Sequence, residues 1–323
     1  MKKIIIPSII FAFSGCDNKG QETVSLTSQQ KKELQTFLQR AKSEQVFVHG
    51  GTFWMGDFCS KMRNGGPYCT SDKNNKPVHE VELSNFSISK FKITHENYAF
   101  YLEITGQPKQ HFDKEWRNKT LSDMTFLKNS PAIITWTEAS NYCLWLKKET
   151  GLPYSLPTEA QWEYAARNHG QYVIVATDDG TLRVNKKTGK GENFATDEDR
   201  DEVGEPNGIL PSLISFPVDK YPPSPLGLYN MADNGKEWVI DWYDPDYYSK
   251  SRKMEPLGPD QPVVKDRTGG QYLKVLRGAS NPTPGFPSGL TITRYYQVKD
   301  PEAPLGTTAR CVVNTTTPTN TNH

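Results

Sequence analysis

Thiols and imidazoles are the side chains of this 323-residue chain that could ligate a transition metal or activate a nucleophile. The sequence contains five cysteines and six histidines, which are Cys16, Cys59, Cys69, Cys143 and Cys311, and His49, His79, His95, His111, His169 and His323. No CxxC pair is present, and no two histidines have the spacing that places both on one face of a helix, so the pattern does not predict a zinc site. His79 and His95, each followed by Glu, could still converge in the fold.

Cys16 directly follows a sequence with the properties of an export signal. Lys2 and Lys3 form a basic start, and residues 4–13 form an apolar run that is too short to span a bilayer. The motif Phe13-Ser-Gly-Cys16 resembles the lipobox of bacterial lipoproteins, which implies cleavage before Cys16 and lipidation of its thiol. We therefore expect residues 1–15 to be a lipoprotein signal peptide and residues 16–45 to comprise the lipidated cysteine, a tether and a short helix. An ordinary signal peptide with an incidental cysteine is the alternative.

The residue after Cys16 indicates where in the cell the protein is held, and the net charge indicates which class of partner is excluded. In the lipoproteins that this motif resembles, Asp after the lipidated cysteine favours retention in the inner membrane, and Asp17 fits that pattern. We expect a periplasm-facing protein of the bacterial cell envelope, held at the inner membrane by its lipid. The formal net charge of +1 argues against a nucleic-acid partner, which would require clustered positive charge.

The other four cysteines would lie in an oxidising compartment, where disulfides form. Four cysteines allow three pairings. Cys59 and Cys69 bracket a Gly-Gly-Pro turn that one local bridge would close, and this leaves Cys143 with Cys311. A pair of buried free thiols at Cys143 and Cys311 is the alternative.

The elements that must position these residues are short and separated by many turns. Gly and Pro together number 47, from 24 and 23, and apolar residues make up 35% of the chain, which favours a loop-rich α/β protein. One helix is predicted where four apolar residues share a face, at Leu34, Phe37, Leu38 and Ala41. Three more helices are predicted to begin after Thr94 and after the capping boxes Thr135-x-x-Glu138 and Thr158-x-x-Gln161. Strands are predicted where apolar residues alternate, at Val81/Leu83 and Phe86/Ile88. Regular signals become sparse after residue 168, and residues 314–323 form a polar tail that we expect to be flexible.

Six blocks of sequence, in order, resemble the formylglycine-generating enzyme family, also called the sulfatase-modifying factor family. They are FVHGGTFWMG (47–56), PVHEV with SKFKITHENY (77–81 and 89–98), WTEASNYCLW with LPTEAQWEYAAR (136–145 and 156–167), GLYNM with NGKEW and DWY (227–231, 234–238 and 241–243), LRGAS with Arg294 (276–280), and ARC (309–311). The resemblance implies a single α/β (α+β) domain of the C-type-lectin-like kind over residues 46–313. In some members the cysteines that match Cys143 and Cys311 form a disulfide.

The sequence differs from this family at the residues that bind copper. Formylglycine-generating enzymes hold Cu(I) with two cysteines just after an Arg-Gly-Gly-Ser segment, and soft thiolate is the ligand that Cu(I) selects. Here Arg277-Gly-Ala-Ser280 is followed by Asn281-Pro-Thr-Pro-Gly-Phe-Pro-Ser288, which contains no cysteine. We therefore expect no copper and no formylglycine generation. A histidine-held iron, as in other branches of the superfamily, has no matching motif, and Ser280 lies in no Gly-x-Ser-x-Gly elbow.

Calcium is the metal that the resemblance still implies, because members often hold structural Ca²⁺ with carboxylate, amide and carbonyl oxygens. The first candidate site comprises Asn234, Gly235 and Glu237. The second comprises Asn193, Phe194, Asn207 and Ile209, where Asn207 replaces the usual Asp. Hydrogen-bonded turns without metal are the alternative at both.

Two classes of function remain. The first is a non-catalytic, protein-binding lipoprotein, either an assembly or structural factor of the envelope or an immunity protein against a secreted toxin. The second is a periplasmic oxidoreductase-like enzyme with altered, non-thiolate chemistry. The absence of a motif that brings thiols or histidines together favours the first.

In catalytic members the substrate peptide lies across the face built around the Arg-Gly-Gly-Ser segment. The matching residues here are Trp238, Trp242, Tyr243, Arg277, Ser280, Asn281, Phe286, Arg294, Tyr295 and Tyr296. Aromatic residues and Arg are enriched at interface anchors. We favour a framework role for Trp238, Trp242 and Arg277, and a binding role for Phe286 and its proline-rich loop.

Overall fold

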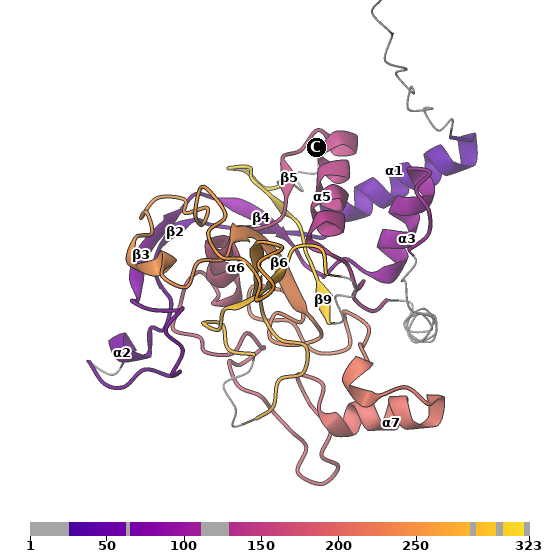
Figure 1. Cartoon of the computed structure of the whole chain (residues 1–323). Coiled ribbons are helices and arrows are strands. Elements are labelled where there is room, and N and C mark those ends of the chain that lie inside the picture. The colour runs from indigo at the N-terminus through magenta and orange to yellow at the C-terminus, as the bar shows by residue number, and fades with distance from the viewer. Residues whose placement is uncertain (1–25, 63–64, 111–128, 285–288, 302–305, 320–323) are drawn as a thin grey trace, which may run out of the picture.

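The structure is a computed structural model. It describes residues 26–62, 65–110, 129–284, 289–301 and 306–319, so the expected signal peptide, Cys16 and Phe286 lie outside the described residues. The helices are α1 (Ser28–Ser43), α2 (Cys59–Met62), α3 (His95–Ile104), α5 (Trp136–Thr150), α6 (Glu159–Ala166) and α7 (Asp197–Asn207), with the short 3-10 turns η1 (Pro211–Leu213) and η2 (Tyr247–Ser249). Short helices joined by long loops agree with the predicted α/β, loop-rich class (Figure 1).

The strands of the described chain form three small sheets. Their bounds are β1 (Gln45–Val48), β2 (Gly51–Met55), β3 (His79–Leu83), β4 (Phe86–Ser89), β5 (Tyr154–Ser155), β6 (Lys236–Trp242), β7 (Leu273–Arg277), β8 (Tyr295–Val298), β9 (Thr307–Thr308) and β10 (Val312–Val313). The first sheet has the order β1-β4-β10-β5, the second pairs β2 with β3, and the third has the order β8-β7-β6-β9. All pairs are antiparallel except β6 with β9.

The predicted helix starts are confirmed at their capping residues. Thr135 and Thr158 each accept a hydrogen bond from the third residue of the helix that follows, and Glu138 and Gln161 bond back to the cap. Thr94 caps α3 in the same way, without the reciprocal bond. Local hydrogen bonding alone fixes these boundaries, which is why the sequence was sufficient to locate them.

Helix α1, the short helix that we expected between the tether and the domain, packs onto the domain. The ring of Phe37 stacks on Phe100 of α3 with centroids 4.7 Å apart and lies 5.6 Å from the ring of Trp145 in α5. These three helices lie together on one side of the molecule, opposite β2 and β3 (Figure 1). The folded unit therefore begins at α1, upstream of the boundary at residue 46 that we expected.

Both predicted disulfides are present. Cys143 of α5 bonds to Cys311, the residue before β10, and links the helical side to the first sheet. Cys59 bonds to Cys69 and closes a local loop. Each Cα–Cα distance, 5.8 Å and 5.6 Å, lies within the range that a disulfide spans.

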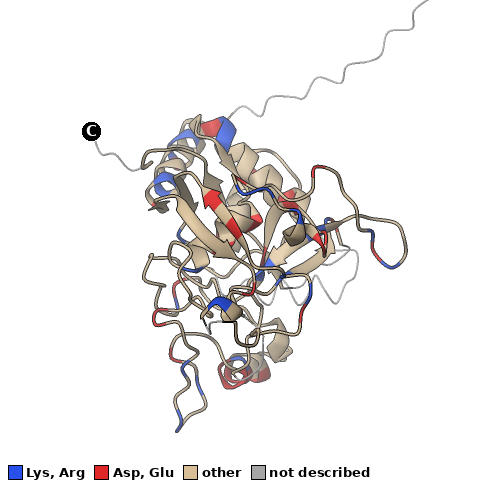
Figure 2. Ribbon diagram, turned by 90° about the vertical axis from the view of Figure 1, so that its left-hand side faces the viewer, with Lys and Arg blue, Asp and Glu red and all other residues tan. Residues whose placement is uncertain are grey.

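Helix α7 lies in the region where we expected few regular elements. Its cap is a box formed by Thr196 and Asp199, in which Asp takes the place of the usual Glu or Gln. Its first turn carries three acidic residues, and elsewhere acidic and basic residues are interspersed over the ribbon (Figure 2). None of the helices in the described ranges has the length and apolar content needed to cross a bilayer.

Candidate functional site

Helix α6 places two glutamates in the interior, where they meet arginines from two other segments and the arginine that caps the end of α6 itself. Arg294 donates to both oxygens of Glu159, at 2.7 and 2.9 Å. Arg277, the last residue of β7, joins Glu159 to Glu163 with bonds of 2.7 and 2.8 Å. Arg167 donates to Glu163 at 2.8 Å. All five side chains are buried, so this charged cluster is part of the structural core.

Asp241 of β6 extends the cluster, because its Oδ2 accepts a 2.7 Å hydrogen bond from the backbone N–H of Glu159 at the start of α6. Burial, with a contribution from the charge of Glu159, raises the pKa of Asp241 to about 7. Burial alone would also raise the pKa of Glu159, but Arg294 and Arg277 outweigh it and lower that pKa below its usual value. The two pKa values therefore move in opposite directions, because Glu159 accepts hydrogen bonds from two arginines, whereas burial outweighs the nearby cations at Asp241.

The residues predicted to form one binding face divide into two groups. Trp238, Tyr243, Arg277 and Arg294 are buried. For Trp238 and Arg277 this agrees with the framework role that we favoured. Arg294 is also interior, because its guanidinium binds Glu159, and Tyr243 is buried beneath the exposed ring of Tyr296. Trp242, Ser280, Asn281 and Tyr295 are partly exposed, and Tyr296 is 51% exposed. Phe286 lies outside the described residues.

A small cavity of about 100 Å³ lies beside Ser280. Its lining consists of Ile133, Ser212, Leu213, Ile214, Ser215, Gly235, Ser280, Asn281 and Gly306. Ser280 Oγ donates to the carbonyl oxygen of Gly306 at 3.1 Å, and a Cβ at Gly306 would lie 2.6 Å from that Oγ, so only glycine allows this close approach. The cavity lining offers hydroxyl, amide and carbonyl groups together with apolar side chains.

Lys236 connects the cavity to Tyr295, an aromatic residue of β8 that is partly accessible to solvent. The N–H of Lys236 donates to the carbonyl of Gly306 at 2.8 Å, and the Lys236 ammonium lies 4.4 Å from the centre of the Tyr295 ring. Tyr296 stacks on buried Tyr243, with ring centroids 4.2 Å apart. Strand β8, which carries both Tyr295 and Tyr296, is at one edge of its sheet among the described strands.

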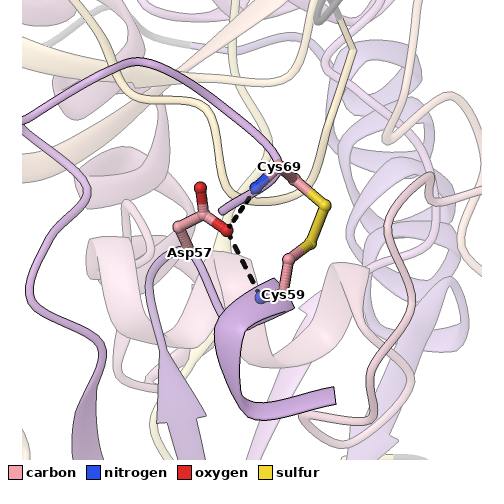
Figure 3. A group of neighbouring side chains, drawn as sticks. All are labelled: Asp57, Cys59 and Cys69. Atoms are coloured by element: carbon pink, nitrogen blue, oxygen red, sulfur yellow. Dashed lines mark hydrogen bonds between the residues drawn. A yellow bond between two sulfur atoms is a disulfide. The ribbon is translucent and has the colours of Figure 1, made fainter. Parts of the chain in front are cut away.

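One group of three potential metal ligands occurs in the described part of the chain, at Asp57, Cys59 and Cys69 (Figure 3). Its two sulfurs are joined in a disulfide and offer no thiolate. The Asp57 carboxylate accepts hydrogen bonds from the N–H groups of Cys59, Cys69 and Thr70, at 3.3, 3.1 and 3.0 Å. Asp57 therefore holds the disulfide loop, and the group does not fit a metal.

The first predicted calcium site does not fit a metal ion either. The Asn234 carboxamide bonds with both of its polar atoms to the backbone of Phe216, at 2.9 and 2.8 Å. Both oxygens of Glu237 accept from Arg310, at 2.6 and 2.9 Å. The carbonyl of Gly235 accepts from the ammonium of Lys92. Each of the three expected ligands is already bound to another part of the protein.

The second predicted calcium site is also occupied by protein contacts. The Asn193 carboxamide accepts from the N–H of Arg183 at 2.9 Å and donates to Asp178 at 2.8 Å. Asn207, at the end of α7, is exposed and donates to the carbonyl of Val203 at 2.7 Å. Phe194 and Ile209 are buried in the interior. The Asn207 side chain serves its own helix, which does not fit the role of a ligand.

The two histidines followed by Glu have separate surroundings. His79 packs against Tyr248, with ring centroids 4.6 Å apart, and its Nδ1 lies 3.2 Å from the carbonyl of Pro77. His95 begins α3, and burial lowers its pKa to about 4. Burial also lowers the pKa of His79. Neither belongs to a group of three potential ligands in the described ranges, so the structure does not bring them together as a metal site.

The family model of the sulfatase-modifying factor enzyme 1-like domain matches residues 30–288. The chain belongs to this family. It is 29% identical over 275 residues to the formylglycine-generating enzyme of Streptomyces coelicolor, a match that covers 72% of this chain and 80% of that protein. It is also 29% identical over 269 residues to the serine/threonine-protein kinase pkn1 of Chlamydia caviae, covering 76% of this chain but only 37% of that protein.

The structural comparison gives the same fold. The solved structure of PvdO from Pseudomonas aeruginosa aligns with a TM-score of 0.54 at 20% identity, and the alignment covers 83% of this chain and 93% of that one. This agrees with a single domain of the formylglycine-generating enzyme type, as the sequence blocks predicted. The candidate functional site of this sulfatase-modifying factor domain is the cavity beside Ser280. Its lining includes Ser280, the last residue of the Arg277-Gly-Ala-Ser280 segment, and Asn281, which follows it.

Proposed function

We propose that this chain is a membrane-anchored lipoprotein of the cell envelope whose sulfatase-modifying factor domain binds another protein without catalysis. The observation that carries the proposal is the lining of the cavity beside Ser280. Among the described residues this lining contains no thiol, imidazole, carboxylate or amine side chain. Such a lining can bind and orient a polar chain, but its serine hydroxyls have no base among these lining residues to activate them, and it offers no soft ligand for copper.

The cysteine inventory supports the same proposal. Copper chemistry of the formylglycine-generating type needs a free thiolate pair. Four of the five cysteines form disulfides, and the fifth, Cys16, is the expected lipidation site. No cysteine is left to bind Cu(I) near Ser280.

An extended polypeptide is the ligand that this surface fits best. Strand β8 lies at a sheet edge, where a peptide can add as a further strand, and it presents the ring of Tyr296 to solvent. The cavity, with Ser280 and Asn281, would take a side chain of that peptide. The partner that we propose is a secreted toxin, which this protein would neutralise, or an assembly component of the envelope.

The absence of catalysis is tested with the full purified chain, loaded with copper and incubated with a Cys-x-Pro-x-Arg peptide. We expect no aldehyde product and no retained copper or iron in elemental analysis. Aldehyde formation, or one copper or iron ion per chain, would contradict the proposal and favour an oxidoreductase with altered chemistry.

The binding face is tested by placing a photo-crosslinking amino acid at Asn281 and, as a matched control, at Lys187, which is also in an exposed loop but outside the proposed surface. In cells of the source bacterium we expect one discrete adduct from Asn281, identified by mass spectrometry, and none from Lys187. The same adduct from both positions, or none from Asn281, would place the interface elsewhere.

The anchor is tested separately with Cys16→Ser, because lipidation of this thiol would license cleavage of the signal. We expect the wild type to incorporate labelled fatty acid and to sediment with inner membranes. The variant should lose the label and accumulate in the uncleaved form. A labelled or normally processed variant would show that the protein is exported by an ordinary signal.

A further inference from the structure

The side chain of Lys92 ends in a cage of oxygen atoms at the start of β6. It is fully buried, and its ammonium donates to the carbonyl oxygens of Asp233, at 2.7 Å, and of Gly235. The same nitrogen lies 3.5 Å from Oε1 of Glu237. Carbonyl and carboxylate oxygens are the ligands that a hard cation takes. The amine thus has the surroundings of a bound cation, beside the residues expected to hold calcium.

The charges around this cage are already compensated by the protein. Glu237 faces Lys92 on one side and Arg310 on the other. The buried carboxylate of Asp233 faces Lys92 and Arg200. Three cations therefore surround two carboxylates, and a divalent ion would add positive charge where no water can screen it.

The contacts of the amine fit its charged form, because its nitrogen donates to two carbonyl oxygens and lies beside the carboxylate of Glu237.

We propose that Lys92 is the permanent cation of this site, and that the domain is stabilised there by its own ammonium group and not by calcium. The inference concerns how the fold is held together and goes beyond the proposed binding function. Its physical basis is that the covalent cation needs no uptake from the surroundings, so the domain stays folded when the free calcium concentration varies.

The first test measures the thermal unfolding midpoint and the calcium content of the full chain in EGTA and in excess CaCl₂. Asn207→Ala is measured in parallel, because it removes an exposed ligand of the second predicted calcium site. We expect no bound calcium and the same midpoint in both buffers. A midpoint that falls in EGTA, or one calcium ion per chain, in both the wild type and Asn207→Ala would overturn the proposal.

The second test compares Lys92→Met with Lys90→Met. Methionine keeps most of the length of the side chain but removes the charge and the donors, whereas Lys90 is partly exposed and lies over the rings of Phe91 and Tyr229. We expect a large decrease in the unfolding midpoint for Lys92→Met and a small one for Lys90→Met. A Lys92→Met protein as stable as the wild type would overturn the proposal. If Lys92→Met does not fold at all, the calcium measurement on the wild type still decides.

Discussion

Arg294 and Tyr296 are two residues apart in the chain and lie in opposite surroundings. Arg294 is 3% exposed and its guanidinium binds both oxygens of Glu159, whereas Tyr296 is 51% exposed at a sheet edge. Residue type alone would place the arginine outside and the aromatic ring inside. The difference shows that burial in this region follows the partners that a side chain meets and not its residue type: Arg294 serves the charged interior, and Tyr296 stays accessible to solvent.

The largest expected loss of stability comes from removing the Cys143–Cys311 disulfide. Replacing both Cys143 and Cys311 by Ala removes a disulfide that links residues 168 positions apart. In the chain-entropy model this should lower the unfolding free energy by about 5 kcal/mol. Replacing Cys59 and Cys69, which are 10 positions apart, should cost about 3 kcal/mol. Urea denaturation of both double variants measures this ordering. Equal losses of unfolding free energy would show that the greater length of the loop closed by Cys143 and Cys311 adds nothing to stability.

The buried ion cluster should be next in size. Arg294→Met leaves Glu159 without its bidentate partner in a site that excludes water, which should cost roughly 3–5 kcal/mol. Arg183→Met removes ion pairs to Asp178 and Asp179 at the surface, where solvent screens them, and should cost far less. Chemical denaturation of the two variants compares the regions directly. Similar losses would contradict the view that burial makes the interior arginine indispensable.

Asp241 should make the interior sensitive to pH. Its folded-state pKa of about 7 is above the model value of 3.8, so between about pH 4 and 7 the folded state holds a proton that the unfolded state releases. This group therefore adds stability at low pH that is lost as the pH rises through 7. In Asp241→Asn the unfolding free energy should fall less than in the wild type between pH 5 and 8.

Asp266→Asn is the control for that measurement. Hydrogen bonds, first from Thr268, lower the pKa of Asp266 below 3.8, so the group stays ionised between pH 5 and 8 in both states. This variant should keep the pH dependence of the wild type. The interpretation of Asp241 would be refuted if both variants, or neither, changed the slope.

Tyr296→Ala should have the smallest effect on stability. It removes an exposed ring and its stacking on Tyr243, so the loss of unfolding free energy should stay within about 1 kcal/mol. The adduct formed from the crosslinker at Asn281 should nevertheless weaken. A variant with a much larger stability loss would show that Tyr296 belongs to the core, and an unchanged adduct would remove it from the interface.

Local signals predicted the helix starts and the two strands correctly, because a threonine cap and a period of two depend on neighbours in the chain. They were insufficient at α7, whose box contains Asp199 in place of Glu or Gln and whose last turn contains Pro206. The resemblance to the family placed Arg294 on the binding face, whereas its side chain binds an interior glutamate 135 positions away. The cluster could have been suspected from Glu159 and Glu163, which share one face of a helix whose residues are all buried.

The sequence by itself determined the family, the α/β class and the lack of cysteine after Ser280, and it predicted the two disulfide pairings that the structure contains. These follow from residue identities, their order and their spacing. Only the tertiary structure decided that α1 packs on the domain, that Arg277 and Arg294 belong to the core, and that Lys92 lies among the expected calcium ligands. The reason is physical: the charge state and role of a buried polar group depend on partners brought from distant segments, and in one sequence no local pattern records which segments meet.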